Sequence, residues 1–492
     1  MKLLLIWPQI DQSLFSYKPL LDIFGDKGQF FPLPLISAAA HFPEHWELRL
    51  LDMQFEQLSE KDIGWADYVL VAADNLQIDS LLKNTDITRA NAKVIVFGEA
   101  LSALVCQGLD HITMVKGDFG EMSKTCREKT VAEEITEDMV SGNLKQTYET
   151  IPCNETYQFM VPRYDLVEPR LYFSLSLKLS KGQGRNYRRK PLKQIVSELD
   201  ILYSLSGGFK SIYLTDDDLI GDVKENNERR EQFILLLEYI HDWQCKNSFP
   251  FDFFFHGTLS SAHDELTGVF KKMADAGISI MLLPLNRCHQ TTFGAQSRDE
   301  VQKICSKVDF FRKQGIGVFG KVTIESHIKV RDVDFFAQLI KNTSIPVVFV
   351  DTSLHGNDDH KLNEQMQLRL LREIYQPSKY FARCIRWISE WNDEYVAKRM
   401  TGTVRANQDY RRVIRGIMLQ GFKRRYAISY WYYLIQVLVR FSYKPARFSL
   451  AVFLGYMYEV MYGQLIASYT KRKTIPLTSH HSIKKEGIEV NG

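Results

Sequence analysis

The chain has 492 residues, of which 45% are hydrophobic and 25% are charged. These proportions are ordinary for globular proteins, and they exclude collagen-like, coiled-coil and wholly disordered chains. At roughly 150 residues per domain, the length predicts two to four domains.

The charge is unevenly distributed along the chain, although the net charge is only +3. Residues 398–485 hold seventeen Lys and Arg against Asp409 and Glu459, which gives this region a net charge of +15. Because the last seven residues carry −2, residues 1–397 carry −10. An acidic body with a basic C-terminal region indicates a separate role for that region, and we expect no nucleic-acid partner.

Residues 1–125 alternate short apolar strands with helical spacers, a pattern typical of a parallel, doubly wound Rossmann-type sheet. The first strand, Lys2–Trp7, resembles the start of a signal peptide. No small-residue cleavage site follows it, so we interpret it as a buried strand. A helix is expected at Leu33–His41, and further strands are expected at Glu47–Leu51, Tyr68–Ala73, Lys93–Phe97 and Ile112–Lys116.

The ligand of such a sheet binds beyond the carboxyl ends of the strands. No Gly-x-Gly-x-x-Gly motif follows the first strand, which argues against a nicotinamide or flavin dinucleotide. The candidate binding residues at these ends are Gln9, Asn75, Gln77, Gly98, Glu99 and Gly117.

The charged, threonine-rich segment 126–168 is typical of a linker. From 169 to 360 the alternation resumes with longer helices, and six strand–helix units predict an open (β/α)6 partial barrel of the TIM type. The expected strands are Tyr172–Leu179, Lys210–Thr215, Phe251–Phe255, Ile278–Pro284, Val318–Ile324 and Pro346–Asp351.

The seven cysteines are widely spaced, and no two are separated by two residues, which excludes a zinc knuckle or a thioredoxin-type pair. This usage is typical of reduced, buried thiols in a cytoplasmic protein. The cysteines are Cys106, Cys126, Cys153, Cys245, Cys288, Cys305 and Cys384.

Residues 361–473 are helical by pattern, and residues 474–492 are polar and expected to be disordered. The apolar stretches Tyr430–Ile435 and Phe448–Thr470 are flanked by Lys and Arg. The second stretch is long enough to span a bilayer, but Glu459 and several small or polar residues argue against a span. Two interpretations remain: an interfacial helix pair within 411–473 on an anionic membrane surface, or a helical cap packed on the barrel.

Several stretches, taken together and in order, resemble the cobalamin-binding radical S-adenosylmethionine proteins. The similarity is greatest to the branch that acts on hopanoids and other lipids or natural products. Pro162–Leu166 is similar to the family's Pro-Arg-Phe-Asp-Leu entry to the barrel, and Asp216–Gly221 to its Asp-Asp-Asn-Phe-Ile-Gly. The other matching stretches include Phe31–Leu35, Ala38–Ala40, Pro43–Glu47, Trp65–Val69, Asn75–Gln77, Lys190–Pro191 and Ile345–Val347. The resemblance implies a cobalamin-binding-like domain at 1–125 and a radical-S-adenosylmethionine-like barrel at 169–360.

One departure from the family affects the expected chemistry. The family places Cys-x3-Cys-x2-Cys after the first barrel strand, where three thiolates hold a four-iron cluster that binds S-adenosylmethionine. Here the corresponding segment, Lys178–Arg189, contains no cysteine. We therefore predict that no four-iron cluster forms, which makes binding of S-adenosylmethionine doubtful. Cobalamin is compatible with the Rossmann pattern, although Glu99 would crowd a close backbone approach.

The mouth of the predicted barrel carries further candidates, for which we favour the simpler interpretation and expect no metal. Three aspartates suit Mg²⁺, or one of them caps the next helix. His256 is a candidate general base or a hydrogen-bonded strand-end histidine. Cys288 and His289 are an unfavoured nucleophile pair, because neighbours on a strand point to opposite faces. The barrel-mouth set is Asp216, Asp217, Asp218, His256, Asn286 and Arg287.

The loop 178–190 is rich in basic residues and contains two glycines. It either grips a phosphate or another anion, or is a solvated loop. The candidate anion-binding residues are Lys181, Arg185, Arg188 and Arg189.

Three functional hypotheses follow from these observations. The first is a pseudoenzyme: an auxiliary partner of an active radical S-adenosylmethionine paralogue or pathway enzyme in lipid or natural-product biosynthesis. The second is a cobalamin-dependent enzyme, for example a methyltransferase, that works without the cluster. The third is a module that binds a lipid or small molecule. We expect a cytoplasmic location, peripheral on the inner membrane if the C-terminal region binds lipid.

Overall fold

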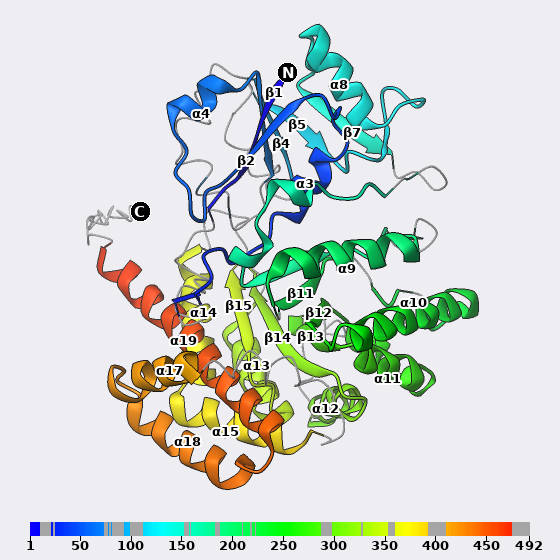
Figure 1. The fold of residues 1–492 in the computed structure, drawn as a ribbon. Helices are drawn as coiled ribbons and strands as arrows, with labels where there is room; N and C mark the ends of the chain where they lie inside the picture. The colour runs from blue at the N-terminus through cyan, green and yellow to red at the C-terminus, as the bar shows by residue number, and fades with distance from the viewer. Residues whose placement is uncertain are drawn as a thin grey trace, which may run out of the picture.

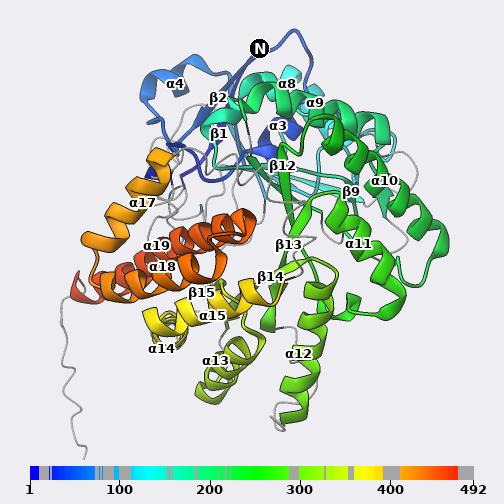
Figure 2. The same cartoon turned by 60° about the horizontal axis from the view of Figure 1, so that its bottom comes forward.

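The structure is a computed structural model, drawn in Figures 1 and 2. It describes residues 1–9, 21–22, 25–72, 77, 80, 93–98, 112–151, 157, 159–182, 187–208, 210–216, 219–221, 223–286, 298–325, 328–352, 360–391 and 410–474.

The first layer is a seven-stranded sheet in the order β2-β1-β3-β4-β5-β7-β6, in which only β6 runs antiparallel to its neighbour. The central strands β1, β3 and β4 are almost wholly apolar and buried, as expected where helices cover both faces of a parallel sheet. The strands are β1 (Lys2–Trp7), β2 (Glu47–Asp52), β3 (Tyr68–Ala72), β4 (Lys93–Phe97), β5 (Thr113–Lys116), β6 (Met122–Ser123) and β7 (Thr147–Ile151). The helices placed in this region are α3 (Leu33–Ala39), α4 (Glu60–Trp65) and α8 (Val131–Ser141).

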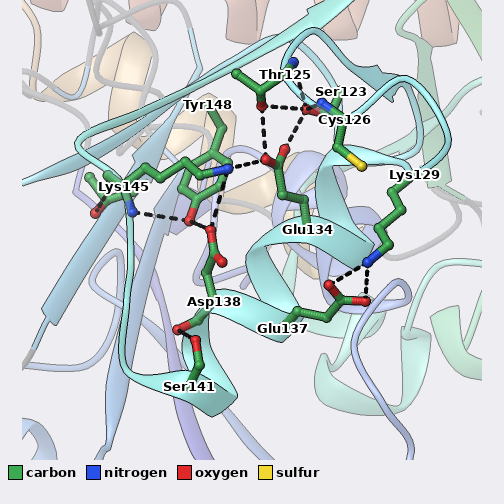
Figure 3. Close-up of polar contacts among 11 residues, drawn as sticks. Ser123, Thr125, Cys126, Lys129, Glu134, Glu137, Asp138, Ser141, Lys145 and Tyr148 are labelled. Carbon is green, nitrogen blue, oxygen red and sulfur yellow. Dashed lines mark hydrogen bonds and ion pairs between the residues drawn. The ribbon is translucent and has the colours of Figure 1, made fainter.

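The segment 126–168, for which the charged composition predicts a linker, includes α8 and β7 of this first layer. Figure 3 shows how several of its charged residues are paired. The Glu134 carboxylate is buried and accepts hydrogen bonds from Ser123 Oγ, Thr125 Oγ1 and Lys145 Nζ. Tyr148 Oη donates to Asp138 at 2.7 Å. The first layer therefore continues to Ile151, and its polar cluster is satisfied by its own side chains.

The second layer is a six-stranded, all-parallel sheet in the order β15-β14-β13-β12-β11-β8, which confirms the predicted partial barrel. Its strands are β8 (Ser174–Leu177), β11 (Lys210–Leu214), β12 (Phe251–His256), β13 (Ile278–Pro284), β14 (Gly317–Ile324) and β15 (Val348–Thr352). Its helices are α9 (Leu192–Ser206), α10 (Asn227–Lys246), α11 (Thr267–Asp275), α12 (Arg298–Lys313) and α13 (Val330–Thr343). A short hairpin of β9 (Ser180–Lys181) and β10 (Arg188–Arg189) follows β8.

The C-terminal region is a helical layer whose core is continuous with that of the barrel. Its helices are α14 (His360–Ile374), α15 (Pro377–Ser389), α17 (Tyr410–Phe422), α18 (Ala427–Phe441) and α19 (Pro445–Thr474). Residues 454–461 of α19 are buried throughout, against α14, α15, α17 and α18. The interfacial-helix interpretation is therefore wrong for this part of 448–470, because its side chains pack inside the protein. No helix among the described residues is long and apolar enough to cross a membrane.

Candidate functional site

The carboxyl edge of the first sheet lies against the start of the barrel. Tyr172, two residues before β8, donates from its Oη to the Asp52 carboxylate at the end of β2, at 2.7 Å. Gln54 donates to the same carboxylate from its backbone at 2.8 Å and from its side chain at 3.1 Å. Burial raises the pKa of Asp52 to about 6, although these hydrogen bonds act in the opposite direction.

Close packing supports the same contact between the two layers. Gly28 forms a parallel bridge with Tyr172, and a Cβ atom at residue 28 would lie 2.7 Å from Cδ1 of that ring. Phe31 and Phe55 hold the ring edge-on, with centroids 5.2 and 5.8 Å away. Lys210 Nζ of β11 reaches Asp26 at 2.7 Å. The first sheet is thus fixed to the barrel by ion-pair, hydrogen-bond and aromatic contacts.

The β9–β10 hairpin lies within residues 178–190 and follows β8. Its first turn is held by Asp216, which follows β11 and is buried. Asp216 accepts from Ser180 Oγ at 2.5 Å and from Leu179 N at 3.2 Å. Burial raises the pKa of Asp216, whereas the hydrogen bonds from the hairpin oppose that shift. Asp216 therefore fastens this loop.

The end of the hairpin is anchored by a buried ion pair. Lys190 Nζ lies 2.8 Å from Glu198 Oε1 on α9, and the two side chains are 4% and 0% exposed. Tyr164 Oη and Gln194 Nε2 each donate to the Glu198 carboxylate, both at 3.0 Å. Burial lowers the pKa of Lys190, and Glu198 opposes that shift. The network is internally satisfied, as a buried pair must be to persist.

The tip of the first hairpin strand contacts the first sheet. Lys181 Nζ lies 2.8 Å from Asp118 and 3.1 Å from Glu121, which follow β5, and 4.4 Å from the centroid of the Tyr157 ring. Burial alone would raise the pKa of Asp118, but Lys181 and the amide of Gly120 bring it below its ordinary value. This contact joins the carboxyl edges of the two sheets.

Of the predicted anion-binding residues, the three that the structure describes have partners within the protein. Lys181 is already paired with two carboxylates. Arg189 donates to Tyr187 Oη at 3.0 Å and lies over the Phe233 ring, and Arg188 donates to the Tyr187 carbonyl. Arg185 lies outside the described residues.

The barrel-mouth candidates that the structure describes have local partners. His256 ends β12 on the partly exposed face of the sheet, and its ring lies edge-on to Tyr213 at 5.6 Å. Asn286 follows β13, and both ends of its amide are bonded to the backbone of Thr323 on β14. Its role is to join two strands. Asp217, Asp218, Arg287, Cys288 and His289 lie outside the described residues. Within the described part of the chain, no cluster of three metal-ligating side chains is present.

The candidate cofactor residues at the first sheet have mixed roles. Gln77 Nε2 donates to the Pro8 carbonyl at 2.7 Å, so this amide joins the ends of β1 and β3 beside Gln9. Gly98 and Gly117 have φ of +115° and +124°, which favour glycine. Gly98 is exposed and leaves backbone accessible after β4, which suits close approach of a flat cofactor. Asn75 and Glu99 lie outside the described residues.

Comparisons with known proteins agree with this architecture. Residues 363–467 match a domain family described only as a domain of unknown function, DUF4070. An uncharacterized methyltransferase of Synechocystis sp., sll1242, is 28% identical over 283 residues, covering 54% of this chain and 49% of the relative. The hopanoid C-2 methylase of Rhodopseudomonas palustris is 22% identical over 371 residues, covering 71% of this chain and 67% of that protein.

A solved structure resembles almost the whole chain. It is OxsB, a cobalamin-dependent S-adenosylmethionine radical enzyme, with a TM-score of 0.50 and 12% identity, covering 96% of this chain and 80% of OxsB. This likeness confirms the predicted fold. The two methylase relatives support the family resemblance, although the matched region spans only about half the length of sll1242.

Sequence reasoning missed the residues that connect the two layers. Asp52 is the last residue of β2, and Asp118 lies two residues beyond β5, so both are at strand ends, where ligands of such sheets bind. Their partners Tyr172 and Lys181 come from the barrel, and no local pattern indicates that pairing.

Proposed function

We propose that this protein is a cluster-less relative of cobalamin-dependent radical enzymes. On this proposal it acts as an auxiliary partner of an active enzyme that modifies a lipid or natural product. The observation that carries the proposal is the β9–β10 hairpin. No cysteine lies between Cys153 and Cys245, so the hairpin offers no thiolate to iron.

The bonding of the hairpin supports the same proposal. A loop that holds a cluster must present three thiolates toward one point, and their spacing is set by the metal. This loop is held by oxygen and nitrogen contacts, through Asp216, Glu198 and Asp118. The residues of this segment supply no cysteine ligand for a four-iron cluster, which supports the proposal.

A second candidate is a cobalamin-dependent enzyme, such as a methyltransferase, that uses no cluster. The exposed backbone at Gly98 favours it, as does the similarity to one protein named as an uncharacterized methyltransferase and one named as a hopanoid methylase. Bound cobalamin would supply a cobalt that can carry a methyl group. The candidate residues for holding it are Gly98, Gly117 and Gln9.

Anaerobic reconstitution with iron and sulfide tests the first proposal, with the Rhodopseudomonas hopanoid methylase treated in parallel. We expect no stoichiometric cluster in this chain. A variant in which the partly exposed Cys126, Cys245 and Cys305 are replaced by alanine identifies iron bound by stray thiols. A four-iron spectrum at one cluster per chain that survives these replacements would overturn the proposal.

Two further measurements separate the candidates. Equilibrium dialysis against hydroxocobalamin is expected to show weak binding or none, and submicromolar affinity would move the second candidate to first place. Purified cluster-bearing paralogues from the same organism are then assayed with and without this chain. Faster turnover or a co-eluting complex supports the auxiliary role, and the absence of both contradicts it.

A further inference from the structure

Helix α18 carries an apolar stripe on the side that faces away from the protein core. Tyr430, Val437 and Phe441 are buried and define its inner side. At 100° per residue, the opposite side is formed by Ile428, Tyr432, Ile435, Val439 and, just past the helix, Tyr443. All five are exposed, with Ile428 at 87% and Val439 and Tyr443 at 73% each. A helix that is apolar on both sides is expected to be covered by something on its outer side.

Helix α17 repeats the pattern on a smaller scale. Ile414, Met418 and Phe422 recur every four residues and are all exposed, whereas Gln420 is buried and Gly416 packs against Tyr456. Trp431 of α18 donates to the Gly421 carbonyl at 2.9 Å and joins the two helices into a hairpin. Figure 2 brings α17 and α18 to the near side of the molecule, with α15 and α19 beside them.

The charge around these stripes has one sign. Between residues 410 and 447 there are nine Lys and Arg and no Asp or Glu. Arg424 is bonded to Glu459, but Lys423, Arg425 and Arg440 are exposed, and no ion pair is found for them within the described residues. Lys423 and Arg425 lie at the turn between the helices, and Arg440 at the far end of α18.

We propose that this surface, the outer sides of α17 and α18 with Lys423, Arg425 and Arg440, docks on a membrane containing anionic lipid. Exposed aliphatic side chains with tyrosines and basic residues at their borders suit the boundary between headgroups and acyl chains. A segment with nine basic residues and no Asp or Glu between 410 and 447 suits an anionic sheet of headgroups better than a protein surface, whose charges are mixed. The surface lies outside α19, so docking requires no helix to leave the core.

Vesicle flotation of the full chain at low salt tests this proposal. The vesicles contain two parts phosphatidylcholine to one part phosphatidylglycerol, with pure phosphatidylcholine in parallel. Each basic residue near such a surface contributes about 1 kcal/mol, or about fivefold in affinity. The triple variant Lys423→Gln, Arg425→Gln, Arg440→Gln should therefore bind about a hundredfold more weakly. The double variant Ile428→Glu, Ile435→Glu should not float.

Two matched controls carry the same chemical changes elsewhere. Leu235→Glu with Tyr239→Glu alters two exposed apolar residues of α10. Lys303→Gln, Lys307→Gln and Lys313→Gln remove three exposed charges from α12. Both controls should float like the original chain, and thermal unfolding of all variants reports whether each is folded.

Several outcomes would overturn the proposal. One is a full chain that stays out of the lipid fraction at low salt, and another is equal binding to neutral vesicles. A third is a loss of vesicle binding in the control variants that equals the loss in the test variants. The last outcome comes from light scattering. If the chain binds no vesicles but forms a dimer, and the Ile428→Glu, Ile435→Glu variant is a monomer, the surface is assigned to a second copy of this chain.

Discussion

Two hairpins of this protein are rich in basic residues. Basic side chains are buried and paired in one hairpin, and exposed in the other. In the β9–β10 hairpin, Lys181 and Lys190 point into the protein and meet carboxylates from β5 and α9. In the α17–α18 hairpin, Lys423 and Arg425 remain exposed with no ion pair among the described residues, beside an apolar stripe. A run of basic residues in the sequence therefore does not by itself indicate a ligand surface, because the fold can bring carboxylates to it.

The charged residues of the two hairpins contribute to different properties of the protein, namely stability and binding. The buried charges of the first hairpin are needed for the fold, because an unpaired buried charge is costly. The exposed charges of the second hairpin, such as Lys423 and Arg425, add little to stability, because an exposed charge is well solvated. Substitutions of the buried charges in the first region should therefore alter unfolding, and substitutions of these exposed charges in the second should alter binding.

The largest effect is expected from Glu198→Ala, which leaves Lys190 buried without its partner. Breaking a buried pair by removing one member costs about 3–5 kcal/mol. The measurement is the urea-unfolding midpoint. The matched control is Glu238→Ala, whose partner Lys272 lies 2.6 Å away in an exposed pair. That control should cost less than about 1 kcal/mol. Equal losses in the two variants would show that the anchor of the β9–β10 hairpin is not buried as described.

A second prediction concerns pH and the contact between the two layers. The folded-state pKa of Asp52 is about 6, above its ordinary value of 3.8. Between these values the folded state retains a proton that the unfolded chain has lost, so stability is greatest below 3.8 and falls as pH rises through about 6. The shift corresponds to roughly 3 kcal/mol. Relative to Asp52→Asn, the original chain should lose this stability between pH 4 and 7.

Tyr172, which donates a hydrogen bond to Asp52, provides a second test of this pH dependence. Tyr172→Phe removes a hydrogen bond that lowers the pKa of Asp52. The fall in stability should then extend to higher pH than in the original chain. Urea unfolding of all three proteins over the same pH range makes the comparison. A fall that is identical in the original chain and Asp52→Asn would assign the pH dependence to other groups.

A smaller effect is expected from Gly28→Ala at the same contact. The new Cβ would lie 2.7 Å from the Tyr172 ring, which Phe31 and Phe55 hold in place. Overpacking of this kind costs about 1–3 kcal/mol. Gly64→Ala in α4 is the control, because nothing lies within 4 Å of its Cβ and alanine favours a helix. The thermal midpoint should fall for the first variant and hold or rise for the second.

Most of the architecture follows from local pattern. Apolar runs such as Ile278–Pro284 form strands with the predicted bounds, because a buried parallel strand must be apolar on both sides. The helix and strand within segment 126–168 could not be predicted from its composition. Glu134 looks like a solvated charge in the sequence, yet three donors around it make its burial possible.

The site was less predictable than the fold, for a physical reason. The positions of Asp216 and Lys181 at strand ends are visible in the sequence, but their partners come from other strands and, for Lys181, from the other layer. A side chain that closes a loop and one that binds a ligand have the same local signature. Only the long-range contact distinguishes them.

The smallest effect on stability is expected from a substitution in the turn of the α17–α18 hairpin. Two adjacent arginines there differ in exposure and in pairing. Arg425 is exposed, so Arg425→Gln should change unfolding by less than about 0.5 kcal/mol. It should nevertheless weaken binding to anionic vesicles about fivefold. Arg424 forms a bidentate pair with Glu459, which is only 1% exposed. Arg424→Gln should therefore destabilise the helical layer measurably. If Arg425→Gln instead lowers stability as much as Arg424→Gln, the outward charges support the fold, and the contrast between the two hairpins is lost.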